Sequence, residues 1–253
     1  MSLKPSVEIA FTKAKAYERK GEVASAAQMY QSILSRFPKN LRAQKALAQL
    51  PENNPVSQRA SVAYINQETN RLAQAYQQKQ YHKVIEQGQK LLSSATNSAE
   101  LYNLMGAAYN RLEQFPMAVQ SYRQAIKIDP KFLDAYNNLG NCLKLHHNLA
   151  EAETAYRQAL KISPTHADAN YNLGILLSEQ DNDDAAVTYY LRAIAAQPDH
   201  VQAHSNLGVI YKNQGNIDAA LGHYSEALRI APNRPMSLYN LANLLLDTGR
   251  LDE

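Results

Sequence analysis

Apolar and small side chains recur along this chain with a period of 34 residues. Four prolines mark the period, and each follows an apolar segment such as AVQSYRQAIKID: Pro130, Pro164, Pro198 and Pro232. Within each period, apolar residues three and four positions apart form the stripes that are typical of amphipathic helices. A proline ends a helix because it lacks a backbone N–H and clashes with the preceding turn. The pattern therefore predicts a series of helix pairs, each closed by a proline.

Small residues indicate where the two helices of a pair meet. A glycine recurs in the first helix, where it costs about 1 kcal/mol relative to alanine: Gly106, Gly140, Gly174 and Gly208. We expect a second helix to cross there too closely for a Cβ atom. The small residues expected to face these glycines lie early in the second helix: Ala118, Ala152, Ala186 and Ala220. A tyrosine and another alanine follow on the same helical face: Tyr122, Tyr156, Tyr190 and Tyr224, then Ala125, Ala159, Ala193 and Ala227.

The same register divides the chain into an N-terminal segment and a main array. Residues 1–50 contain one complete repeat at 7–40 and the start of a further helix. The sequence PENNP at 51–55 predicts a turn or hinge, and residues 51–64 lead into a long helix. The array covers 65–253, with a degenerate repeat at 65–98, four good repeats at 99–132, 133–166, 167–200 and 201–234, and a truncated one at 235–253.

The last segment contains only a first helix. Leu241, Leu244 and Leu245 would then have no following helix to cover them, whereas a solenoid needs a polar cap at each end. We therefore expect the native protein to continue past Glu253.

These residues resemble the tetratricopeptide repeat, in which Leu-Gly and Tyr occupy one helix and Ala, an aromatic residue and Pro the next. The resemblance covers nearly the whole chain. It implies an all-α fold, a right-handed superhelical solenoid of antiparallel helix pairs whose first helices line a concave groove.

An asparagine immediately precedes the Leu-Gly or Leu-Ala pair in four successive first helices: Asn138, Asn172, Asn206 and Asn240. A side-chain amide offers one acceptor and two donors, so a row of amides can pair with the backbone of an extended peptide. The stretches FLDAYNNLGNCLK and QAHSNLGVIYKNQGN resemble repeats of O-linked N-acetylglucosamine transferases, and this resemblance implies a peptide-binding asparagine ladder at those four positions. Leu104 interrupts the ladder one repeat earlier. The alternative is that these amides bond to the neighbouring repeat and bind no ligand.

Helical spacing adds further candidates for the peptide-binding groove: Asn137, Asn141, Tyr171, Lys144, Lys212, Asp134 and Asp168. For any single one of these, a solvated helix face is the competing interpretation. The chaperone-associated repeats that clamp a C-terminal carboxylate are a poor match, because Glu100, Asp134 and Asp168 would repel such a ligand.

Composition excludes several other classes of protein. With 45% apolar and 19% charged residues the chain has enough apolar surface to fold, and no apolar run is long enough to span a membrane. A single cysteine, Cys142, excludes a disulfide framework and fits the cytoplasm. The seven histidines show no metal-site arrangement, and no basic stripe with interleaved aromatic residues indicates nucleic-acid binding. We expect no cofactor and no catalytic site, because neither a nucleophile set nor a phosphate-binding loop occurs.

The sequence thus predicts a non-catalytic scaffold that binds an extended peptide or a partner protein in its groove. Two alternatives stay open. The N-terminal arrangement is similar to that of bacterial repeat proteins fused to a sulfotransferase or glycosyltransferase domain, which implies a substrate-recruiting arm. Self-assembly through the uncapped C-terminal end or the N-terminal repeat is the other.

Overall fold

The computed structural model describes residues 4–50, 55–92 and 97–249, and over these ranges it consists of fourteen α-helices without a strand. The all-α prediction is therefore confirmed. The chain divides into two compact units, residues 1–71 and residues 72–253.

The first unit is built on one helix pair and a third helix, α1 Lys4–Arg19, α2 Val23–Arg36 and α3 Leu41–Gln49. Its core includes Phe11, Tyr30 and Ile33, and the Phe11 and Tyr30 rings meet edge to face. The next helix, α4 Pro55–Gln77, crosses the division between the units. Apart from Pro55, the hinge predicted at 51–55 lies outside the described residues.

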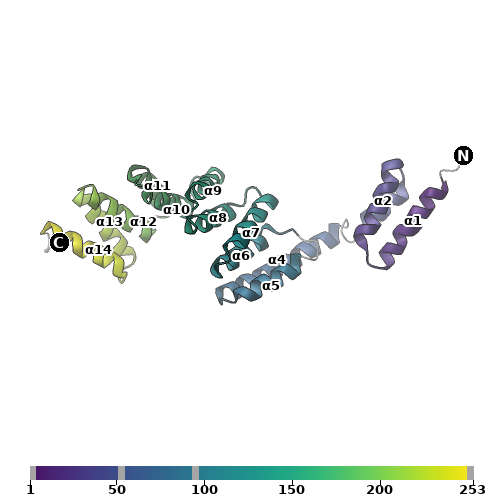
Figure 1. The fold of residues 1–253 in the computed structure, drawn as a ribbon, viewed down its shortest axis with the longest axis horizontal. Helices are drawn as coiled ribbons and strands as arrows, with labels where there is room; N and C mark the ends of the chain where they lie inside the picture. The colour runs from purple at the N-terminus through teal and green to yellow at the C-terminus, as the bar shows by residue number, and fades with distance from the viewer. Residues whose placement is uncertain (1–3, 51–54, 93–96, 250–253) are drawn as a thin grey trace. The chain divides into compact units, whose positions relative to one another are not determined.

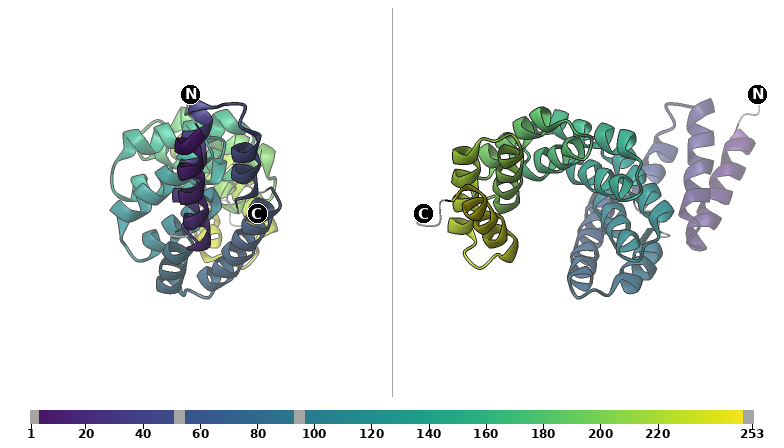
Figure 2. Two further views of the ribbon diagram at one scale, coloured as in Figure 1. Left: turned by 90° about the vertical axis from the view of Figure 1, so that its right-hand side faces the viewer. Right: turned by 60° about the vertical axis from the view of Figure 1, so that its left-hand side comes forward.

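The second unit is a succession of antiparallel helix pairs, as the solenoid prediction requires. Its pairs follow one another in chain order along an arc (Figures 1 and 2). After α5 Tyr81–Leu92, the helices are α6 Ala99–Arg111, α7 Phe115–Ile128, α8 Leu133–Leu145, α9 Leu149–Ile162, α10 Ala167–Ser178, α11 Asp183–Ala196, α12 Val201–Asn213, α13 Ile217–Ile230 and α14 Pro235–Thr248.

Short polar signals define where the helices begin. Asn148, Asn182 and Asn216 each cap a second helix by accepting a hydrogen bond from a backbone N–H three residues on. The residue before each of these caps has a left-handed backbone, with φ 58° in His147, 59° in Asp181 and 75° in Gly215. The turn geometry therefore repeats with the same 34-residue period as the helices.

The close approach at the glycines is confirmed, but its partner is not the predicted alanine. A Cβ atom on Gly140 would lie 2.5 Å from Cε1 and 2.7 Å from Cδ1 of Tyr156, and Gly106 and Gly174 meet their own tyrosine rings in the same way. These atoms are the nearest neighbours, so the facing group is the ring and not Ala152 or its equivalents. The alanines are fully buried in the helix interface beside it. Glycine is required because the tyrosine ring occupies the space that a Cβ atom would take.

In the degenerate repeat the large residue is on the first helix and the glycine is on the second. Leu72 stands at the glycine position and Gly88 at the tyrosine position, 34 residues before Gly106 and Tyr122. Met105 of the next repeat fills the space, since a Cβ atom on Gly88 would lie 2.6 Å from its Sδ atom. The space beside Gly88 is thus filled by side chains of the following first helix, α6.

The expectation that Leu244 would be uncovered is wrong. Leu244 is buried on α14 against Ala220 and Tyr224, and Leu241 packs at the edge of the same cluster. The apolar side chains that α14 leaves exposed include Met236, Leu238 and Leu246. The face of α14 that we expected to be open therefore packs inward, against α13.

Candidate functional site

The asparagine ladder is hydrogen-bonded from repeat to repeat. Asn138 Nδ2 on α8 donates to Asn103 Oδ1 on α6, and Asn172 Nδ2 on α10 donates to Asn137 Oδ1 on α8, both at 3.0 Å. In each pair the acceptor lies on the preceding first helix, 35 residues earlier. The amides of Asn138 and Asn172 thus join successive first helices, as the alternative interpretation of the sequence supposed.

The ladder changes at Asn206. The acceptor position one repeat earlier is Tyr171, where the preceding repeats have asparagine. Asn206 Nδ2 donates to the Tyr190 hydroxyl at 3.2 Å, and the Tyr171 and Tyr190 rings lie 5.8 Å apart between centroids. Burial raises the pKa of Tyr171, and a hydrogen bond with Asn206 offsets part of that rise. Asn240, on α14, is half-buried.

A polar cleft of about 530 Å³ lies over the middle of α8, the first half of α10, the turn before α12 and the start of α12. It brings together six of the predicted site residues, Asn137, Asn138, Asn141, Asp168, Tyr171 and Asn172. The remaining lining residues are Gln197, Asp199, His200 and Gln202. Six of the predicted residues therefore line one cleft between two successive repeats, whose other lining residues the sequence analysis had not identified.

Several lining side chains are held in place by local hydrogen bonds. Asn141 Oδ1 accepts from the Tyr156 hydroxyl at 2.7 Å, so the packing tyrosine also orients a cleft amide. His200 Nδ1 caps α12 by accepting from the Ala203 N–H at 3.2 Å, and its Nε2 lies 4.0 Å from Asp168 Oδ1. Because Nδ1 accepts, a neutral His200 carries its proton on Nε2, facing the carboxylate.

Asn137 and His200 are more than nine-tenths buried although they line the cleft, with 8% and 6% of their surfaces exposed. Burial lowers the pKa of His200, and the carboxylate of Asp168 offsets part of that effect. His200 is therefore neutral near pH 7, and its ring lies 4.6 Å from the Tyr171 ring between centroids. The base of the cleft is rigid, polar and without a cationic imidazole.

The other predicted site residues lie outside this cleft. Lys144 forms an ion pair with Glu179 and Lys212 one with Asp247, each at 2.7 Å. Asp134 lies 4.0 Å from Nε2 of His166, which caps α10. These side chains link one repeat to the next.

The missed contacts share a signal that the sequence does contain. The Asn138–Asn103, Asn172–Asn137, Lys144–Glu179 and Lys212–Asp247 pairs all join residues 35 positions apart. Residues that are 35 positions apart, one period plus one residue, are therefore the ones that meet between successive first helices. Complementary polar residues at this offset would have indicated the inter-repeat bonds, whereas the turn residues Gln197 and Asp199 fall outside any helical pattern.

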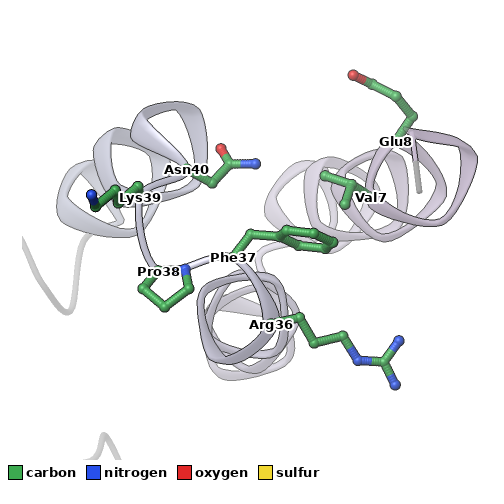
Figure 3. A pocket seen from close by; sticks show the side chains of 7 residues that line it. All are labelled: Val7, Glu8, Arg36, Phe37, Pro38, Lys39 and Asn40. Atoms are coloured by element: carbon green, nitrogen blue, oxygen red, sulfur yellow. The ribbon is translucent and has the colours of Figure 1, made fainter. Parts of the chain in front are cut away.

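The first unit has a hollow of a different character. It measures about 940 Å³, and Val7, Phe37 and Pro38 form apolar walls with Arg36 and Lys39 at the rim (Figure 3). The other lining residues, Glu8 and Asn40, are engaged, because Glu8 pairs with Arg42 and Asn40 caps α3. This hollow lacks the row of amides that the cleft presents.

In the described part of the chain, no three or more His, Cys, Asp or Glu side chains are grouped so that they could hold a metal ion. Cys142 is fully buried, and burial raises the pKa of its thiol. None of the helices that the structure describes is both long and apolar enough to cross a membrane.

Family models of the tetratricopeptide repeat match residues 7–50, 132–199, 171–235 and 213–253, and a TPR repeat model matches 106–145. No curated protein sequence matches the chain.

Three solved structures illustrate its likeness to known folds. MamA is 23% identical, with a TM-score of 0.56 over 62% of this chain and 92% of that one. YrrB, described as a TPR protein with an unusual peptide-binding site, is 21% identical, with a TM-score of 0.54 over 65% and 84%. TTC0263, a thermophilic TPR protein of Thermus thermophilus, is 20% identical, with a TM-score of 0.58 over 72% and 98%. At these identities the likeness is one of fold.

Proposed function

We propose that this chain, which belongs to the tetratricopeptide repeat family, is a non-catalytic scaffold that binds an extended segment of a partner protein in the cleft over α8, α10 and α12. The observation that carries the proposal is the convergence of four asparagine amides, from two successive first helices, in one polar cleft. YrrB supports it to the extent that a protein of the same fold is described as having a peptide-binding site.

The bonds between repeats leave part of each amide for a ligand. The Asn172–Asn137 bond uses one N–H of Asn172 and one lone pair of Asn137. Among the described residues, no hydrogen bond engages Asn172 Oδ1 or donates from Asn137 Nδ2. The pair therefore retains at least one acceptor and one donor, which complement the N–H and C=O of a peptide group.

Bonding between repeats also favours binding by fixing the amides in advance. An amide that is already held in one rotamer loses less conformational entropy when a ligand arrives. The two interpretations of the ladder are thus compatible: the same asparagines join the repeats and present a prepared row to a peptide.

A substrate-recruiting arm would use the same cleft in the same way. None of the matched structures reported above is described as a transferase, so the resemblance to transferase repeats stays a prediction. Association of one copy with another also stays a prediction, and light scattering over a concentration series tests it.

The test compares two variants that break the same inter-repeat bond from opposite sides. Asn138→Ala removes a cleft amide together with its bond to Asn103, whereas Asn103→Ala removes the bond alone, since Asn103 does not line the cleft. A 12-residue peptide selected from a random phage-displayed library on the full chain would serve as the fluorescent probe.

We expect both variants to lower the melting temperature to a similar extent, because each loses one hydrogen bond worth about 1 kcal/mol. Asn138→Ala should lower the affinity for the probe peptide by about fivefold to tenfold, which is equivalent to one lost hydrogen bond to the ligand. Asn103→Ala should have a much smaller effect on binding, and the exposed Asn213→Ala none. Equal affinities for the two bond-breaking variants would show that the ladder is structural only.

A further inference from the structure

We propose that the segment bound in this cleft carries a lysine or arginine, and that the carboxylates of Asp168 and Asp199 hold its cationic group beside the Tyr171 ring. This inference rests on the proposed peptide-binding function and names the chemistry of the ligand.

The cleft is a built site rather than a group of surface acids. Asn137 and His200 are both more than nine-tenths buried and still contribute to its lining. Asn137 holds the amide of Asn172, and His200 holds the start of α12. The two aspartates therefore stand at the mouth of a prearranged polar cavity, with Asp168 on α10 and Asp199 in the turn before α12.

The charge of the cleft is negative and is not neutralised locally. Among its described lining residues there is neither a lysine nor an arginine, and neither Asp168 nor Asp199 forms an ion pair with a described one. His200 faces Asp168 but is neutral near pH 7. The nearby lysines are paired elsewhere, Lys144 with Glu179 and Lys212 with Asp247.

One cation acts near the edge of the site. Arg234, the residue before α14, is close enough to Tyr171 to lower the pKa of its hydroxyl, although burial outweighs this effect. Arg234 does not line the cleft, so the two carboxylates remain open to a cation from the ligand.

The Tyr171 ring adds a second feature that favours a cation. Its side chain is half-buried and lines the cleft, and its ring contacts the rings of His200 and Tyr190. A cation within about 6 Å of an aromatic face gains cation–π energy, and arginine also donates several hydrogen bonds to carboxylates. A glutamate at the same place in the ligand would instead face two like charges.

A purely structural role for Asp168 predicts a different experimental result. Asp168 lies in the first turn of α10, where a negative charge stabilises the helix dipole. That role would change stability when the charge is removed but would not distinguish ligands. The test therefore measures ligand preference.

The probes are three fluorescein-labelled peptides of one 12-residue sequence that differ only in a central arginine, glutamine or glutamate. We expect the full chain to bind the arginine peptide about tenfold more tightly than the glutamine peptide, and the glutamate peptide most weakly. The preference for arginine should shrink as the ionic strength is raised from 50 to 300 mM, because the carboxylates are partly exposed to solvent.

The isosteric double variant Asp168→Asn/Asp199→Asn should remove the preference for arginine, so that the arginine and glutamine peptides bind it with similar affinities. Asp181→Asn/Asp184→Asn, which removes the same number of charges at the start of α11 and away from the cleft, is the matched control and should keep the preference. Equal binding of the arginine and glutamine peptides to the unmodified protein would overturn this inference and leave peptide binding standing. Absence of binding by all three would overturn the proposed function as well.

Discussion

The contact between glycine and tyrosine permits a quantitative test of how each helix pair is packed. Gly140→Ala introduces a Cβ atom that would lie 2.5 Å from a ring carbon of Tyr156, about 1 Å closer than the usual contact of 3.5–4.0 Å. The ring is fully buried and its hydroxyl is hydrogen-bonded to Asn141, so it cannot move aside freely. Overpacking of this kind costs about 1–3 kcal/mol.

Gly222→Ala is the matched control. Gly222 lies within α13, and nothing stands within 4 Å of the position that its Cβ would take. Both substitutions gain about 1 kcal/mol of helix propensity, so their difference isolates the contact with the ring. We expect Gly222→Ala to raise the free energy of unfolding by about 1 kcal/mol. The free energy of unfolding of Gly140→Ala should be about 1–3 kcal/mol lower than that of Gly222→Ala.

Urea denaturation measures the global effect, and hydrogen exchange of the α8 and α9 amides measures the local one, because repeat arrays also open locally. In a Tyr156→Leu background the cost of Gly140→Ala should largely disappear, since the ring that it meets is gone. If Gly140→Ala stabilises the protein as much as Gly222→Ala does, the ring contact does not explain the glycine.

Two further predictions concern pH and the turns between helices. Burial, with a smaller effect from the neighbouring His204, lowers the pKa of His223, so the folded protein binds fewer protons than the unfolded chain below the ordinary histidine pKa of about 6.5. Stability should therefore be full above that pH and decline as the pH falls below it. His223→Asn, which keeps a donor for His204 Nδ1, should flatten the decline in thermal melts. In the turns, Glu113→Gly should stabilise the protein by about 1 kcal/mol in urea titrations because Glu113 has φ 59°, and Gly215→Ala at φ 75° should destabilise it by a similar amount. A flat pH profile in the unmodified protein, or opposite signs for the turn variants, would contradict these two accounts.

Most of the fold is predictable from the sequence because each repeat is specified by local signals. Pro130 and its equivalents end the second helices, and asparagines such as Asn148 begin them, so the helix boundaries depend on residues close in the chain. What faces Gly140 depends instead on how two helices cross, which residue types do not reveal. The same reason explains the error at Leu244, whose burial depends on the angle at which α14 meets α13.

The cleft was predictable in part, for a related reason. Periodicity identifies the inward positions of first helices, and therefore Asn137, Asn138 and Asn172. The turn residue Asp199 belongs to no periodic pattern, and only the bend of the chain before α12 brings it beside Asp168. In this solenoid the repeat pattern therefore predicts the cleft residues that lie on the first helices, but not those that lie in the turns between helices.

The change in the ladder at Tyr171 limits where a peptide can be held. Asn138 and Asn172 are fixed by asparagine partners in the preceding repeat, whereas Asn206 meets two tyrosines and donates to one of them. Neither Asn206 nor Asn240 lines the cleft. If preorganised amides provide the affinity, Asn240→Ala should leave the affinity for the selected peptide unchanged, while Asn172→Ala weakens it by about fivefold to tenfold. An equal loss from both would mean that the ligand follows the whole row of first helices, and the cleft over α8, α10 and α12 would then be only one stretch of a longer binding surface.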